Sequence, residues 1–230
     1  MVYRDTLDEL KRFKKLKIIN FMHQIIPAIL SENEEELESE LNKLNGLTNW
    51  LQIDIADGLF VSTRTVEILD LVGFHFKSHL EFHLMTLHPE KYINDCKVVG
   101  AKRIVFQLEA VSNPTELLTS IKSMGMEAGL ALKPETPINK VIPYLDSADV
   151  ILLLTVNPGK QGQALKQSVL QKISSLRKIN RQVKIEVDGG VNLSNVVSVV
   201  EAGADYLVVG SAILQSNDIP RMIDKFLAKI

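Results

Sequence analysis

VKIEVDGGVNLSNVVSVVEAGADYLVVGSAI, residues 183–213, decides the fold, because two short apolar runs in it flank one amphipathic segment. The runs VKIEVD and DYLVVG have the length and the β-branched content of buried strands. The segment NLSNVVSVVEAG between them predicts a helix that begins near Asn192 or Ser194 and ends at Gly203. A strand, a helix and a second strand in this order predict a βαβ unit with parallel strands.

The same alternation occupies the chain from residue 24 onward. Six further strands are predicted: QIIPAIL (24–30), NWLQIDI (49–55), HLEFHL (79–84), KRIVFQL (102–108), MEAGLAL (126–132) and DVILLLTV (149–156). Helices are predicted for EEELESELNKL (34–44), PEKYINDCKVV (89–99), PTELLTSIKSM (114–124) and SVLQKISSLRKI (168–179). Eight units favour a single α/β domain over residues 21–230, a (β/α)8 TIM barrel. A doubly wound open sheet is the main alternative, because it uses the same alternation.

Residues 1–20 do not take part in this alternation of strands and helices. Leu7, Leu10, Phe13 and Leu16 have helical spacing among basic residues, which predicts an N-terminal amphipathic helical extension. Covering the bottom of the barrel is the simpler role for such a helix, and binding to a membrane surface is the alternative.

Composition limits the classes of partner. The net charge of -2 provides no basic field for nucleic acid, so we expect no DNA or RNA partner. The single cysteine, Cys96, cannot form an internal disulfide, and no apolar run approaches the roughly 18 residues of a membrane span. Because the N-terminal residues lack the apolar core of a secretory signal, we expect a cytoplasmic protein with no membrane partner.

Three polar side chains are predicted to meet at the carboxyl ends of the strands. Period-two alternation directs Gln52 and Asp54 into the barrel, and Asp188 is the last residue of its strand. The same parity directs His83 inward from the third predicted strand, which follows the strand of Asp54. An ionised carboxylate inside a barrel requires a cation or strong donors, so Asp54, His83 and Asp188 are candidate metal ligands.

Other polar residues have simpler explanations. Glu81, Lys184 and Glu186 also face inward, but lower in the barrel, where we expect them to pair with one another. His75 and His79 precede His83 with a spacing of four residues, yet a strand cannot place all three on one face, so we expect both to lie at the surface.

Glycine-rich turns follow the last three predicted strands, in VNPGKQGQ, VDGGVN and VVGSAI. Glycine lets backbone N–H groups approach an anion, and a helix beginning after Gly210 would add its positive end. Barrels of this class frequently bind phosphate at this position. The predicted phosphate-binding residues are Gly159, Gly162, Gly189, Gly190, Gly210 and Ser211. Lys160 either assists them or is only solvated.

With these motifs in order, the chain resembles the ribulose-phosphate 3-epimerase family. The resemblance covers nearly all of residues 24–215 and includes PAILS, WLQIDIADGLFV, HLM, HPEKYI, GLALKPETP, TVNPGKQGQ, EVDGGVN and AGADYLVVGSAIL. It implies a metal-dependent enzyme that interconverts D-ribulose 5-phosphate and D-xylulose 5-phosphate. Asp54 and Asp188 match the two acid/base aspartates, and both match metal ligands together with His83.

The chain also departs from the family pattern. Gln52 stands where a histidine ligand is usual, Gln107 likewise replaces a histidine, and Ala28 replaces a serine at the substrate site. The resemblance implies a divalent cation, which is Zn, Mn, Fe, Co or Mg. Because an amide oxygen suits Mg2+ or Mn2+ better than Zn2+, Gln52 leaves the identity of this cation open. The resemblance adds Ala28 and His83 to the expected substrate contacts.

Two alternatives to ribulose-phosphate epimerisation stay open at this point. The chain could be an epimerase for another ketose phosphate, or a phosphosugar-binding relative that has lost catalysis. The resemblance also implies a homo-oligomer, without fixing the number of subunits.

Overall fold

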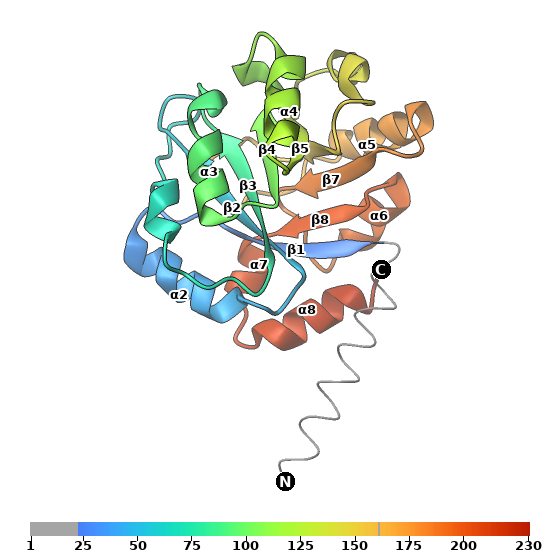
Figure 1. The fold of residues 1–230 in the computed structure, drawn as a ribbon. Helices are drawn as coiled ribbons and strands as arrows, with labels where there is room; N and C mark the ends of the chain where they lie inside the picture. The colour runs from blue at the N-terminus through green and yellow to red at the C-terminus, as the bar shows by residue number, and fades with distance from the viewer. Residues whose placement is uncertain (1–22, 161) are drawn as a thin grey trace.

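The computed structural model describes residues 23–160 and 162–230, in which eight strands close into one barrel (Figure 1). The strands are β1 (Gln24–Ile29), β2 (Trp50–Ala56), β3 (His79–Met85), β4 (Arg103–Gln107), β5 (Glu127–Leu132), β6 (Val150–Leu154), β7 (Lys184–Asp188) and β8 (Tyr206–Val209). Each strand pairs in parallel with the next, and β8 pairs with β1. The (β/α)8 barrel is therefore confirmed, and an open sheet is excluded. The predicted extension at residues 1–20 lies outside the described residues.

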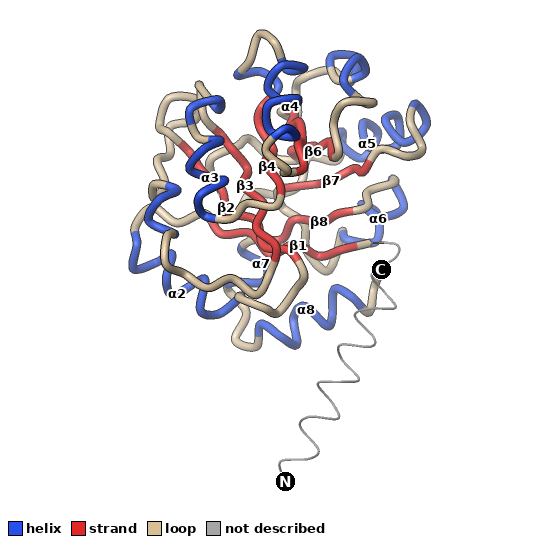
Figure 2. The backbone as a smooth tube through the Cα atoms, viewed as in Figure 1, coloured by secondary structure: helices blue, strands red, loops and turns tan. Residues whose placement is uncertain are grey.

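Helices surround the strands on the outside (Figure 2). They are α2 (Glu34–Leu44), α3 (Ile93–Val99), α4 (Pro114–Ser123), α5 (Ser168–Ile179), α6 (Val196–Ala202), α7 (Ser211–Leu214) and α8 (Ile219–Leu227). The predicted bounds of α2 and α5 match the structure. Short 3-10 helices complete the set: Ile68–Leu71, Pro89–Lys91, Leu108–Ala110, Ile138–Lys140 and Ile142–Tyr144.

Two predicted helices differ from the structure at their first residues. The segment 89–99 divides into a 3-10 turn and α3, and Tyr92 lies between them. The α6 helix begins at Val196, later than predicted, because side chains hold residues 192–195 in a turn. Asn195 Oδ1 accepts from the Asn192 backbone N–H, and Asn192 Oδ1 accepts from the Ser194 backbone N–H. Gly203 ends α6 as predicted, with φ of 116°.

The two faces of the strands contribute to different cores. Leu51, Ile53 and Ile55 of β2 belong to the large apolar cluster shared with the helices. The side chains between them, Gln52 and Asp54, face the barrel interior, as the alternation predicted. The interior therefore holds these polar groups beside two small apolar clusters, one with Leu152 and one with Val208, and the large apolar cluster surrounds the barrel. Among the described residues, no helix is both long and apolar enough to cross a bilayer.

Candidate active site

Asp54, His83 and Asp188 come together inside the barrel from β2, β3 and β7. Each offers one ligand atom, and these three atoms lie within 4.8 Å of one another. The register explains this, because Asp54 lies opposite His83 across the β2–β3 pair. The predicted convergence of two carboxylates and one imidazole is thus present in the structure.

Two glutamine amides hold these three side chains in place. Gln52 Nε2 donates to Asp54 Oδ1 at 2.9 Å and to Asp188 Oδ2 at 3.3 Å. His83 Nδ1 lies 2.8 Å from Asp54 Oδ1 and 3.6 Å from Asp188 Oδ2. On the other side of the ring, Gln107 Nε2 lies 2.7 Å from His83 Nε2. Every member of the cluster therefore has a fixed orientation.

Burial and like charge shift the protonation of this cluster. Burial, and then the nearby Asp54 carboxylate, raise the pKa of Asp188 to about 7, although His83 and Gln52 act in the opposite direction. Burial alone would lower the pKa of His83, but its hydrogen bond to Asp54 and the surrounding carboxylates raise that pKa overall. Asp188 can therefore gain or lose a proton near neutral pH.

The donor set fits a divalent cation. Two carboxylates and one imidazole are common ligands, and Gln52 Oε1 is buried with no hydrogen-bond partner among the described residues. Gln52 Nε2, and not Oε1, is the amide atom that faces Asp54 and Asp188, so Gln52 would become a ligand only after a half-turn of its amide.

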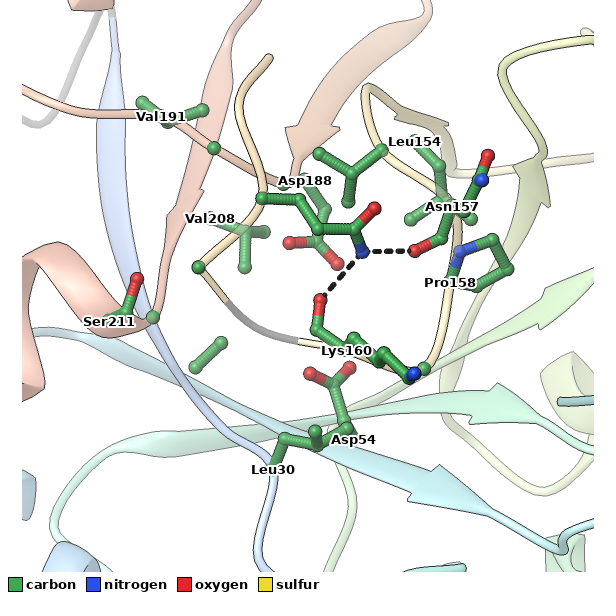
Figure 3. A pocket seen from close by; sticks show the side chains of 18 of the residues that line it. Leu30, Asp54, Leu154, Asn157, Pro158, Lys160, Asp188, Val191, Val208 and Ser211 are labelled. Carbon is green, nitrogen blue, oxygen red and sulfur yellow. Dashed lines mark hydrogen bonds between the residues drawn. The ribbon is translucent and has the colours of Figure 1, made fainter. Parts of the chain in front are cut away.

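A pocket opens above the two aspartates. Figure 3 shows the Asp54 and Asp188 carboxylates directed into it from opposite walls. The pocket has a volume of about 600 Å3, including solvent at its mouth. The predicted substrate residues that line it are Ala28, Gly159, Gly162, Gly189, Gly190, Gly210 and Ser211. His83 and Gln52 lie beneath its surface, fully buried.

The glycine turns form one wall of the pocket. Gly190 has φ of +64°, and a Cβ atom there would lie 2.5 Å from the Leu165 backbone nitrogen. Only glycine therefore allows the turn after β7 to approach the loop after β6. The short helix α7 begins at Ser211, as predicted.

The loop after β6 lies beside the turn after β7 and also lines the pocket mouth. Gln163 Nε2 donates to the carbonyl oxygens of Asn157 and Lys160, at 2.7 and 2.9 Å, and both bonds are drawn in Figure 3. Lys160 lines the pocket, and the described part of the chain offers no carboxylate within ion-pair distance of its ammonium group. Lys160 is thus an available positive charge at the mouth.

Below the aspartates, the barrel is filled by an ion cluster centred on Arg103. Its guanidinium contacts Glu81 Oε2 at 2.7 Å and Glu186 Oε2 at 3.3 Å. The predicted pairing of Lys184 with these glutamates is wrong, because Lys184 is half-exposed and pairs with Asp205 instead. Sequence reasoning missed Arg103, although the alternation in KRIVFQL directs it inward together with Gln107.

Solved structures support the fold of the barrel. A mutant of the tryptophan synthase alpha-subunit of Pyrococcus furiosus superimposes with a TM-score of 0.70 and 16% identity, covering 90% of this chain and 98% of that one. The 3-hexulose-6-phosphate synthase of Salmonella typhimurium gives a TM-score of 0.67 at 15% identity, covering 90% and 97%. At such identities the similarity shows the fold alone.

Sequence comparison goes further. The ribulose-phosphate 3-epimerase of Schizosaccharomyces pombe is 32% identical over 206 residues, which cover 87% of this chain and 90% of that protein. The Bacillus subtilis protein of the same name is 34% identical over 212 residues, covering 89% and 98%. The profile of the ribulose-phosphate 3 epimerase family matches residues 24–214, a span that includes all eight strands. The chain therefore belongs to the ribulose-phosphate 3-epimerase family and is an enzyme of the epimerase class.

Proposed function

We propose that the protein interconverts D-ribulose 5-phosphate and D-xylulose 5-phosphate, with Asp54 and Asp188 as its two acid/base groups. The observation that carries this proposal is that the two carboxylates enter one pocket from β2 and β7, with the glycine turns beside them. Epimerisation beside a carbonyl removes a proton from one face of a carbon and returns a proton to the other face. Two carboxylates on opposite walls suit that task.

The protonation of Asp188 is compatible with an acid/base role. Without a cation, burial and then the negative charge of Asp54 raise the pKa of Asp188 to about 7, and a bound cation would favour the ionised form of this carboxyl group. The ionised aspartate takes the proton from C3, and the protonated one supplies a proton to the opposite face. The roles exchange in the reverse direction.

A divalent cation completes the proposed site. Asp54, His83 and Asp188 would hold it, together with Gln52 Oε1 after a half-turn of that amide, and the cation could be Zn, Mn, Fe, Co or Mg. Such a cation supplies positive charge against the oxyanion that develops on the sugar. The carboxylates, the imidazole and the amide fix its place, and the apolar side chains of Met85, Leu154 and Val208 line the pocket.

The glycine turns would bind the phosphate. Gly189, Gly190 and Gly210 leave the pocket wall without side chains, so backbone groups are accessible to an anion. Lys160, in the loop after β6, would add a positive charge at the mouth. The cytoplasmic location and the homo-oligomeric state expected from the sequence remain predictions.

The reaction can be tested directly by deuterium exchange. Purified protein is incubated in D2O with D-ribulose 5-phosphate and, in turn, Mg2+, Mn2+, Fe2+, Co2+ or Zn2+. We expect xylulose 5-phosphate to form and deuterium to enter C3. Asp54→Asn and Asp188→Asn should each reduce the rate by about 10^2-fold or more, whereas Asp146→Asn, on the exposed surface, should leave it unchanged.

Three outcomes would contradict or change the proposal. Absence of exchange and of turnover with all five cations would reject it. Thermal stabilisation by the sugar phosphate without exchange would instead support a protein that binds a phosphosugar and does not transform it. Exchange with another ketose phosphate, and none with ribulose 5-phosphate, would change the substrate and keep the two aspartates.

A further inference from the structure

The amide of Gln107 lies directly behind the imidazole of His83. Both side chains are fully buried, and Gln107 Nε2 is 2.7 Å from His83 Nε2. An amide nitrogen can only donate a hydrogen bond, so His83 Nε2 must accept in this arrangement. The proton of the neutral ring is then on Nδ1, where it donates to Asp54 Oδ1 at 2.8 Å.

This proton position prevents His83 from binding a cation. Nδ1 is the ring atom that faces both Asp54 and Asp188, so it is the atom that a shared cation would meet. A nitrogen that carries a proton has no free electron pair for a metal. For His83 to become a ligand, its one proton must pass from Nδ1 to Nε2. The Nε2 proton would then face the N–H of Gln107, which is unfavourable.

A rotation of the Gln107 amide removes this conflict. Gln107 Oε1 is buried with no hydrogen-bond partner among the described residues. A half-turn of the amide would exchange its two ends, so that this oxygen would face His83 Nε2. Either orientation leaves one end of the amide unpaired, so the location of the His83 proton decides between them.

We propose that Gln107 is a positioning residue for the cation site, and that its amide turns when His83 binds a divalent cation, so that Oε1 accepts the proton on His83 Nε2. The inference rests on the cation site of the proposed function and does not require turnover. A hydrogen bond from the far nitrogen of a metal-bound histidine fixes the ring and strengthens the ligand. Gln107 therefore acts on cation affinity through His83, without contacting the cation.

The wild-type protein itself provides the first test. The full chain is labelled with 15N in its histidine rings and studied by NMR at mildly alkaline pH. Among its five histidines, the His83 signals are assigned by comparison with His83→Asn. We expect the proton on Nδ1 in a chelator, and on Nε2 after addition of Mg2+ or Zn2+. A proton that stays on Nδ1 with the cation bound would overturn the proposal.

Variants provide the second test, with the Kd for Mn2+ as the measurement. Gln107→Leu removes the acceptor and should weaken binding by about 10- to 100-fold. Gln107→Glu keeps an acceptor for His83 Nε2, so it should bind Mn2+ at least as tightly as wild type. The matched control is Gln171→Leu, on the exposed face of α5, and its Kd should not change.

The outcomes separate this inference from the proposed function. If Gln107→Leu folds and binds Mn2+ as wild type does, Gln107 has no positioning role, whether or not the enzyme turns over. If the proton shift and the order of Kd values are found without epimerisation, the inference stands and the proposed reaction fails. If Gln107→Leu does not fold, the proton shift in the wild type and the Kd of Gln107→Glu still test the proposal.

Discussion

Replacement of Asp188 by asparagine should stabilise the cation-free protein while it abolishes catalysis. The asparagine has nearly the same shape and cannot ionise. In the wild type, burial and the Asp54 carboxylate raise the pKa of Asp188 to about 7, from 3.8 for an unperturbed aspartate. The folded state therefore keeps a proton on Asp188 that the unfolded state has already released, and rising pH favours unfolding over this interval.

The size of the effect follows from the same two pKa values. The difference between about 7 and 3.8, at about 1.4 kcal/mol per unit, gives an upper bound of about 4 kcal/mol for the stability that wild type loses. The contribution of Asp188 is fully present below its unfolded pKa, and it is lost as pH rises through the folded value. Asp188→Asn avoids this loss, but Gln52 then loses a charged acceptor. We expect a net difference of about 1 to 3 kcal/mol.

Urea unfolding in a chelator, repeated from acid to alkaline pH, measures this difference. The free energy of unfolding of Asp188→Asn minus that of wild type should increase between about pH 4 and pH 7 and then stay constant. Asp146→Asn, an exposed substitution, should differ from wild type by less than about 0.5 kcal/mol throughout. A difference that does not change with pH, or one that favours wild type above neutrality, would refute the reasoning.

Three further substitutions test other parts of the barrel. Arg103→Met should destabilise the protein by about 3 to 5 kcal/mol, because Glu81 and Glu186 would stay buried without the guanidinium that pairs with them. In the same urea unfolding experiment, the exposed control Arg64→Met should lower the free energy of unfolding by less than about 1 kcal/mol. Gly190→Ala should raise the KM for the sugar phosphate and should unfold at a lower temperature than the control Gly125→Ala. Both glycines have positive φ, but only Gly190 has backbone atoms within 3 Å of a new Cβ. Equal melting temperatures of the two variants would contradict this prediction. Lys160→Ala should raise that KM by about 5-fold and leave kcat nearly unchanged, and a loss confined to kcat would exclude a role in phosphate binding.

Strand alternation was sufficient to predict the barrel and the inward direction of the site residues. The period of two is a property of the extended backbone, so the inward orientation of Asp54 follows from its place between the outward-facing Ile53 and Ile55 in the sequence. The meeting of Asp54 with Asp188 additionally needs closure of the barrel, which the count of eight units indicated. Both features depend on regular backbone geometry, which can be predicted from the local sequence.

Specific partners could not be predicted in the same way. The pairing of Arg103 with Glu81 and Glu186 depends on which inward residues share a level, and this is set by the stagger of the strands. Lys184 has the inward parity as well, yet it is the first residue of β7 and reaches solvent. The contact of Gln107 with His83 has the same origin, since neither residue identifies the other in the sequence.

The barrel interior has two levels of buried carboxylates, which differ in the groups that surround them. At the lower level, Arg103 lies between Glu81 and Glu186 and offsets part of their repulsion, although burial and the Glu81 carboxylate still raise the pKa of Glu186. At the upper level, Asp54 and Asp188 have only His83 and the neutral amide of Gln52 beside them, and burial followed by the charge of Asp54 raises the pKa of Asp188. A proton, an asparagine and a divalent cation are then three ways to relieve one repulsion. Mn2+ should accordingly raise the free energy of unfolding of wild type at alkaline pH by more than that of Asp188→Asn, whereas equal stabilisation of the two proteins would mean that the cation binds away from the aspartates.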